Sequence, residues 1–335
     1  MTQSAAMADA TPSIDATGLY RLWQVHTRRV PIGTRRDMGD KILLDALGLG
    51  LEQTLTYLAT DLPDYAAFLE WILAIAGRPD PLMLARYEAT LAGWPLPAAV
   101  RDGLAAIDAM PPVLDADDLT YWDVHGFVIL RGAITPSAAE AAAALVWKAN
   151  GAHPDDPDSW YGAPRNQGIM VQLFQHPALE PARRSARVHK AFAQLWGTSN
   201  LWSTVDRVGF NPPEREHHAF RAPRLHWDVS LTRPIPFATQ GVLYLTDTAE
   251  DQGALELVPG FHHRIDAWLN EIGDANAREV DLSAEATRVA AGAGDLVIWR
   301  QDLPHGASPN RARLPRLVQY VNLYSPDMMI QDVWR

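Results

Sequence analysis

Apolar residues recur at helical spacing through the first third of the chain, between Met38 and Met110. Residues three or four positions apart lie on one face of a helix. The first such set is predicted to share a single helix face and consists of Ile42, Leu43, Leu47, Leu51, Leu55 and Leu58. Three more helices are expected, over Tyr65–Ala76, from Asp80-Pro81 to Gly93, and from Leu96-Pro97 to just before Pro111-Pro112. This helical bundle carries no catalytic motif and is interpreted as a packing or oligomerisation module.

The spacing of apolar residues changes after Pro111-Pro112, which is the best candidate for a domain boundary. We therefore expect a flexible tail over residues 1–15, a helical region over 16–112 and a second domain over 113–335. The second domain should open with a short helix, a glycine turn and a strand in TYWDVHGFVILRG. Thr135-Pro136 should then cap an alanine-rich helix that ends near Asn150. A long loop over residues 151–166 and a helix from Glu180 to Trp196 should follow.

Short strand-like runs fill the rest of the chain. Separated by Gly, Pro, Asp and Asn, they favour an antiparallel sandwich or barrel over alternating strand–helix units. The predicted class is therefore α+β, with a β-sandwich or barrel core and flanking helices. The runs are LWSTVDRVGF, RLHWDVSL, QGVLYLTDT, ALELVPG, DLVIWR and RLVQYVNLY.

Composition narrows the functional classes. The 335 residues are 47% hydrophobic and 21% charged, as in a globular protein with a sizeable core, and the net charge is −11. This acidity argues against nucleic acid or an anionic membrane as a partner. The absence of cysteine excludes disulfides and thiolate chemistry and leaves His, Asp and Glu as candidate metal ligands. No stretch reaches the ~20 apolar residues of a membrane span, and the first 15 residues do not look like a signal peptide, so we expect a cytoplasmic protein.

Two polar residues, His226 and Asp228, stand two positions apart in the strand-like run RLHWDVSL. Side chains alternate along a strand, so both should point to one face and Trp227 to the other, into the core. A core-facing imidazole and carboxylate need partners, and a metal ion would satisfy both. A second match, His153-Pro154-Asp155, lies in the proline- and aspartate-rich stretch GAHPDDPD and is discounted as a solvated loop.

Downstream, His305 precedes a Gly-Ala-Ser-Pro-Asn segment, predicted to be a turn, and Arg316 opens the next strand. Two His and one carboxylate on one side of a metal leave the opposite side open, an arrangement suited to Fe(II) and oxygen chemistry. A guanidinium returning beside the metal can form a bidentate pair with a carboxylate ligand.

From about Leu119 to the C-terminus, the chain resembles the phytanoyl-CoA dioxygenase family of Fe(II)/2-oxoglutarate oxygenases. GFVILRGAIT resembles the opening strand of the family, LHWD its HxD segment, DTAEDQGALELVPGFHH its Gly–strand–Pro-Gly stretch, and HGASPNRARLPR its distal histidine and arginine. The resemblance implies a double-stranded β-helix, or jelly-roll, core. It also implies Fe(II), 2-oxoglutarate and O2 as cofactor and co-substrates. His226, Asp228 and His305 would be the iron ligands, and Arg316 would bind the distal carboxylate of 2-oxoglutarate.

Two features depart from the family pattern. The helical region is longer than the family minimum, and Phe261 stands where a serine usually precedes the histidine at His262. His262 and His263 are interpreted as surface or supporting residues, with replacement of His305 as a ligand left open. Halogenating relatives carry a small residue in place of the acid, so Asp228 favours oxygenation.

Further site residues are predicted from their places in the expected strands or, for Trp160 and Gln172, from the region that the resemblance implies closes over the site. Gln319 and Tyr244 are candidate co-substrate contacts. The candidate substrate contacts are Trp160, Gln172, Arg207 and Asn211.

The resemblance implies hydroxylation of an unactivated C–H bond in a small, amino acid-like or secondary-metabolite substrate, with release of succinate and carbon dioxide. Two other readings stay open. One is a catalytically silent jelly-roll that binds a ligand or partner, and the other is an iron-dependent isomerase or desaturase on the same scaffold. The helical region could serve as a homodimer interface or contact a carrier protein.

Overall fold

The structure is a computed structural model that describes residues 13–31, 38–162, 166–220, 225–273, 276–331 and 333–334. Most of the tail predicted over residues 1–15 lies outside the described residues. Within the described part of the chain, every helix is too short or too polar to cross a lipid bilayer. The domain division near residue 112 stays a prediction.

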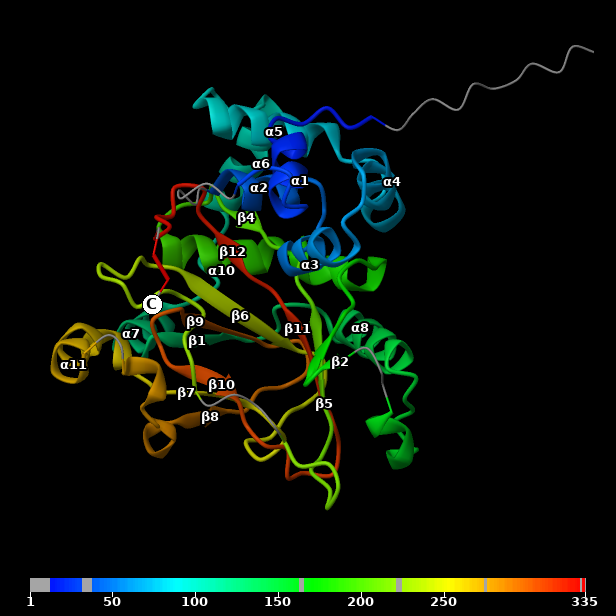
Figure 1. Ribbon diagram of the computed structural model, residues 1–335. Helices are drawn as coiled ribbons and strands as arrows, with labels where there is room; N and C mark the ends of the chain where they lie inside the picture. Colours follow the sequence, from blue (N-terminus) through cyan, green and yellow to red (C-terminus); the bar gives the residue numbers. More distant parts are fainter. Residues whose placement is uncertain are drawn as a thin grey trace, which may run out of the picture.

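The first six helices lie together on one side of the β-sheets, as the blue to cyan ribbons of Figure 1 show. Local signals explain several of their ends. Asp64 and Asp80 cap the helices that follow them, and Gly93, in a left-handed conformation, ends the helix before it. The three helices predicted after residue 64 are thus confirmed. The six are α1 (Leu19–His26), α2 (Met38–Ala46), α3 (Leu51–Asp61), α4 (Tyr65–Ala76), α5 (Pro81–Ala92) and α6 (Ala98–Ala109).

The prediction of one helix through residues 42–58 is wrong, because the chain breaks between α2 and α3. Gly48 has a φ of 73°, which an L side chain rarely adopts. A Cβ on Gly50 would lie only 2.6 Å from the ring of Phe174. The apolar residues on both sides of the break still pack into one cluster, which includes Leu43 and Leu58.

The helices of the second region begin and end largely where the sequence predicts. Thr135 and Ser185 accept backbone hydrogen bonds as N-caps. The helix expected over 180–196 is interrupted at Arg184, and a short 3-10 helix, Pro157–Tyr161, lies within the predicted loop. The five helices are α7 (Ala116–His125), α8 (Pro136–Ala149), α9 (Glu180–Arg183), α10 (Ala186–Trp196) and α11 (Ile265–Ile272).

The β-strands form antiparallel sheets, which confirms the α+β jelly-roll class. Seven strands follow the order β1-β9-β6-β11-β5-β3-β2, three form the sheet β10-β7-β8, and β12 pairs with β4. The strands are β1 (Phe127–Leu130), β2 (Asn166–Gln167), β3 (Met170–Val171), β4 (Trp202–Ser203), β5 (Val208–Asn211), β6 (Thr239–Tyr244), β7 (Leu255–Leu257), β8 (Thr287–Val289), β9 (Leu296–Arg300), β10 (His305–Ala307), β11 (Arg316–Tyr320) and β12 (Leu323–Tyr324).

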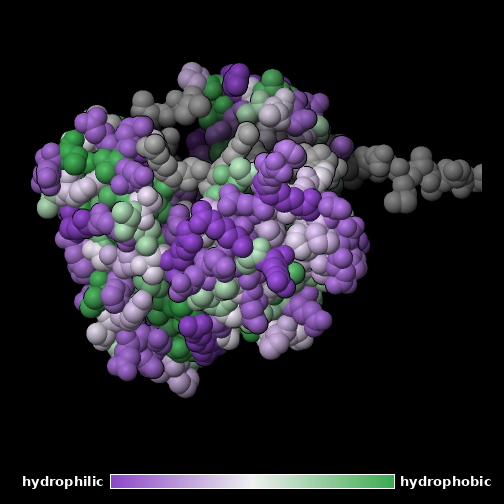
Figure 2. Space-filling view, turned by 90° about the horizontal axis from the view of Figure 1, so that it is seen from below, coloured by the Kyte–Doolittle hydropathy of each residue, from purple (hydrophilic) through white to green (hydrophobic). Residues whose placement is uncertain are grey.

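The large sheet buries both faces, and alternation along its strands assigns each side chain to a face. On β9, Leu296 and Ile298 pack against α8 and α10, whereas Val297 and Trp299 face the cluster shared with the small sheet. The cavity described below opens on this second face. The face of the molecule in Figure 2 is mainly hydrophilic with small separate apolar groups, as expected for a solvated surface.

Two predictions about the HxD region are wrong in detail. Residues 225–231 form no regular strand; the only β-pairing there is a single bridge between His226 and His305. Conversely, Gly306 and Ala307, the first residues of the predicted turn, belong with His305 to strand β10, which pairs with β7. The conformation of the short HxD segment therefore depends on its pairing with His305 rather than on its own strand propensity.

Candidate metal centre and co-substrate cavity

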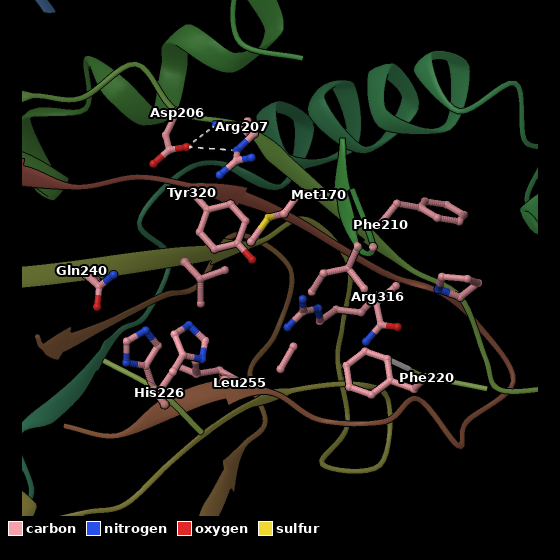
Figure 3. Close-up of a pocket in the computed structure, with 18 of the residues that line it drawn as sticks. Met170, Asp206, Arg207, Phe210, Phe220, His226, Gln240, Leu255, Arg316 and Tyr320 are labelled. Atoms are coloured by element: carbon pink, nitrogen blue, oxygen red, sulfur yellow. Dashed lines mark hydrogen bonds and ion pairs between the residues drawn. The ribbon is translucent and has the colours of Figure 1, made fainter. Parts of the chain in front are cut away.

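A cavity of about 860 Å³ lies on the inner face of the large sheet. Its walls come from β5, β6, β9, β10 and β11, and from loops on either side of β5. Figure 3 shows side chains from these elements converging on one space, with His226 at one side and Arg316 deeper in. One wall includes Lys41 from α2, so the N-terminal helices contribute to the cavity.

The predicted triad comes together in this cavity. The backbones of His226 and His305 exchange two hydrogen bonds of 2.9 and 3.0 Å, and their ring centroids are 4.9 Å apart. Asp228 Oδ1 lies 3.5 Å from His226 Nε2, and its Oδ2 lies 3.3 Å from His305 Nε2. One ligand atom from each residue lies within 4.8 Å of the others. Within the described residues, this is the single such cluster of three.

His305 is oriented for ligation. Its ring is buried, and Nδ1 lies 3.0 Å from the carbonyl of Leu303, to which the protonated nitrogen can donate. With Nδ1 directed at that carbonyl, Nε2 is the nitrogen that faces Asp228 and that could ligate a metal ion as a neutral imidazole.

Asp228 is held from its other side by Gln240, whose amide nitrogen donates to Oδ2 at 2.7 Å. Trp299 Nε1 in turn donates to the amide oxygen of Gln240 at 3.1 Å. Burial alone would raise the pKa of Asp228, but the hydrogen bonds from His305 and Gln240 and the charge of His226 outweigh it and lower the pKa below its usual range. The carboxylate is therefore ionised, as a metal ligand must be.

Arg316 is the cation of the inner cavity. It opens β11 opposite Asn211 and is only 2% exposed. Its Nε and Nη2 are buried and have no hydrogen-bond partner among the described residues. Buried donors left unpaired are costly, so the pair is suited to an anionic group that enters the cavity.

The remaining predicted contacts divide into two groups. Trp160, Arg207 and Asn211 line the cavity. Tyr244 does not line it, because its hydroxyl donates to the carbonyl of Val289, although the charge of Arg316 acts on it.

Gln319 and Gln172 do not fit their predicted roles. Gln319 points to the opposite face of β11, where its amide donates to the carbonyl of Leu179. Gln172 is exposed and outside the lining of the cavity. Alternation from Arg316 already excludes Gln319, since residues three positions apart in a strand point to opposite faces.

The histidines outside the triad are placed elsewhere. His262 and His263 belong to a 3-10 helix, Phe261–His263. Their Nε2 atoms lie 3.0 and 2.8 Å, respectively, from the backbone carbonyl of Asp123. The discounted His153 is exposed and accepts a hydrogen bond from the backbone of Asp155. Trp227 is buried as predicted and donates to the carbonyl of Asp302.

The cavity residues that the sequence analysis missed include Gln240, Trp299, Tyr320 and Asp206. Alternation could have found Tyr320, because Arg316, Val318 and Tyr320 share one face of β11. Gln240 lies in the quoted run QGVLYLTDT, but its contact with Asp228 depends on the position of the HxD segment. No motif or strand alternation in the sequence indicates that Asp206 lines the cavity.

The donor set fits the cofactor and co-substrate that the motifs imply. Two imidazoles and one carboxylate on one side match a facial Fe(II) site, and an unpaired buried guanidinium matches a dicarboxylate.

Comparison with known proteins agrees with this chemistry. The family model described as "Phytanoyl-CoA dioxygenase (PhyH)" matches residues 122–318. A protein of Dictyostelium discoideum named "Putative phytanoyl-CoA dioxygenase" is 19% identical over 257 residues, which are 61% of this chain and 74% of that protein.

Solved structures with similar folds are distant in sequence. AviO1 from Streptomyces viridochromogenes Tue57 is 19% identical, with 65% of this chain and 99% of that chain covered and a TM-score of 0.48. GlcNAc Inducible Gene 2 of Candida albicans is 13% identical, with 64% of each chain covered and a TM-score of 0.50. At these identities the likeness concerns the fold alone. The family model, however, covers more than half of the 335 residues, so the chain belongs to the phytanoyl-CoA dioxygenase family of Fe(II)- and 2-oxoglutarate-dependent oxygenases.

Proposed function

We propose that this protein hydroxylates an unactivated C–H bond of a small organic substrate and releases succinate and carbon dioxide. His226, Asp228 and His305 are the proposed iron ligands, and Arg316 is the proposed partner of the distal carboxylate of 2-oxoglutarate. One observation carries the proposal: Arg316, whose buried Nε and Nη2 have no hydrogen-bond partner among the described residues, lines the same cavity as the three ligand side chains.

Iron and 2-oxoglutarate, when bound, supply the oxygen activation that the protein side chains lack. The protein positions the side chains that would hold the iron. Gln240 holds the carboxylate of Asp228, and the Leu303 carbonyl holds the ring of His305. Trp299, Val242 and Leu255 add apolar walls that limit water near the ligands.

The finer predictions about partners also belong to this proposal. An amino acid-like compound or a secondary metabolite fits the cavity of about 860 Å³. A homodimer interface or carrier-protein contact through the N-terminal helices, and a cytoplasmic location, stay predictions.

Anaerobic titration with Fe(II) and 2-oxoglutarate tests the centre. The readout is the weak visible charge-transfer band of chelated 2-oxoglutarate, recorded for the wild type, His226→Ala and Arg316→Ala. We expect no band without His226, and at least about tenfold weaker 2-oxoglutarate binding without Arg316, because a charge-assisted hydrogen bond is lost. His153→Ala is the matched control, since it removes the exposed second HxD histidine and should leave the band unchanged.

A folded wild-type protein without the band would overturn the oxygenase proposal and favour the ligand-binding jelly-roll. Product mass separates the remaining alternatives. A hydroxylase adds one oxygen atom to the substrate, a desaturase removes two hydrogens, and an isomerase leaves the mass unchanged.

A further inference from the structure

Asp206 carries a carboxylate that lines the cavity and is incompletely paired. Its side chain is 45% exposed, on the loop before β5. Oδ1 accepts a hydrogen bond of 2.7 Å from the backbone amide of Arg207, and the guanidinium Nε of that residue is 3.9 Å away. Within the described chain, no donor lies within hydrogen-bond distance of Oδ2. Figure 3 shows Asp206 and Arg207 at one end of the labelled residues, beyond the ring of Tyr320 from Arg316.

The cations nearest Asp206 are each paired with a different carboxylate. Arg207 Nη1 lies 3.2 Å from Glu52, and Lys41 Nζ lies 3.2 Å from Asp45. Arg183 Nη1 lies 3.1 Å from Glu180, and its other terminal nitrogen donates to the backbone carbonyl of Asp206 rather than to its carboxylate. Of these cations, only Arg207 also lies within ion-pair distance of the Asp206 carboxylate, at 3.9 Å, and it is shared with Glu52.

With Fe(II) and 2-oxoglutarate bound, the charges in the rest of the cavity nearly cancel. The charges of Fe(II), the ionised Asp228, the 2-oxoglutarate dianion and Arg316 cancel. Glu214, the other acid on the cavity wall away from the triad, lies 3.6 Å from Arg311 and accepts the backbone amide of Phe220. Asp206, which shares the guanidinium of Arg207 with Glu52, is therefore the acid facing the substrate space whose charge is only partly compensated.

The surroundings of Asp206 favour a cationic group from outside the chain. Burial raises the pKa of Asp206, and the hydrogen bond and charge of Arg207 offset this only in part. A half-exposed carboxylate still gains from a positively charged donor, because a charge-assisted hydrogen bond is stronger than a neutral one. Tyr320, Thr204 and Asn322 also line the cavity.

We propose that Asp206 is a specificity-determining residue that binds an ammonium group of the substrate, so that the enzyme selects amine-bearing compounds over neutral ones. This proposal rests on the proposed function, because it assumes that the space between Asp206 and the triad holds the substrate. It assigns the N-terminal helices a part in specificity, since Glu52 and Lys41 determine which charges near Asp206 are already paired.

Calorimetry without oxygen tests the proposal on protein loaded with Fe(II) and 2-oxoglutarate. The probes are tyramine, glucosamine and lysine, each compared with the derivative in which an amino group is acetylated. We expect the wild type to bind at least one amine about tenfold or more tightly than its acetylated form, and Asp206→Asn to remove that preference. Asp206→Glu, which keeps the charge, should retain part of it. Glu214→Gln is the matched control and should change the preference by less than about twofold, because Glu214 is already paired.

The proposal is overturned if no amine binds, if acetylated and free amines bind equally, or if Glu214→Gln removes the preference as fully as Asp206→Asn. The charge-transfer band is recorded for every variant. An intact band in Asp206→Asn together with lost amine preference assigns the effect to substrate recognition. A missing band in the wild type means that the proposed function itself has failed, whatever the amines do.

Discussion

Gln240 donates a hydrogen bond of 2.7 Å to Asp228, although the two residues lie on separate elements, β6 and the loop that carries the HxD segment. Trp299 fixes the amide of Gln240 from the other side. The carboxylate of Asp228 is exposed over about half of its surface, so its orientation depends on such contacts. Gln240 is thus a positioning residue for the proposed iron ligand.

Replacing Gln240 should weaken iron binding without removing a ligand. Gln240→Leu is expected to lower Fe(II) affinity by about 10- to 100-fold, the usual effect of losing a hydrogen bond to a ligand. Anaerobic Fe(II) titration measures the change. Gln301→Leu is the control, because Gln301 donates to the carbonyl of Pro236 outside the cavity and should leave the affinity near that of the wild type.

The N-terminal helices should depend on Tyr324 for attachment to the β-sheets. The Tyr324 hydroxyl donates to Asp45 at 2.6 Å, and the backbone amide of Val205 donates to the same carboxylate. Tyr324→Phe is expected to lower the free energy of unfolding by about 1.5–3 kcal/mol, because a buried hydrogen bond to a charged group is lost. Urea unfolding measures it. The exposed Tyr121→Phe should change stability by less than about 0.5 kcal/mol, and an equal loss there would contradict the assignment.

Two glycines should respond in opposite directions to alanine. A Cβ on Gly241 in β6 would lie 2.2 Å from the carbonyl oxygen of Val321, whereas a Cβ on Gly103 in α6 would meet nothing within 4 Å. Gly241→Ala is expected to destabilise the protein by about 1–3 kcal/mol through overpacking. Gly103→Ala should stabilise it by about 0.5–1 kcal/mol by improving helix propensity. Thermal unfolding of both variants checks the signs.

The protein should lose stability as the pH falls below 6.5. Burial lowers the pKa of His26, His189 and His262 from 6.5, so below that pH the unfolded chain takes up protons that the folded chain resists. Because the unfolded state then binds more protons, the free energy of unfolding decreases with falling pH. Urea unfolding at pH 7.5, 6.5 and 5.5 measures this.

His189 provides the specific test of that pH dependence. In His189→Gln the amide can still donate to the carbonyl of Ser199, which lies 2.8 Å from His189 Nε2, but it cannot take up a proton. The variant should therefore lose less stability than the wild type between pH 6.5 and 5.5. An unchanged pH dependence would contradict the role assigned to His189.

Helix ends were predictable because the residues that cap the free backbone groups at a helix end are close to that end in the sequence. Asp80 caps α5 through the amide of Leu82, and Gly93 ends it in a left-handed conformation. The break between α2 and α3 was missed because apolar spacing continues across it, and the contact that reinforces it, Phe174 against Gly50, is non-local.

Strand faces were only partly predictable. Alternation correctly groups Arg316 with Tyr320 and separates Gln319, but using it required knowing which face of β11 looks into the cavity. The HxD segment reads as a strand by composition, yet it forms only the bridge from His226 to His305, so its partner decides its conformation.

The sequence by itself determined the residue types of the triad, the order of the four motifs, the family and those helix ends that have a local capping residue. These depend on side-chain identity and on neighbours along the chain. Only the tertiary structure decided how charges pair around the cavity. Asp45 meets Val205 across 160 positions of sequence, and Arg207 turns to Glu52 rather than fully to Asp206. Electrostatic pairing depends on distance in space, which no local pattern encodes.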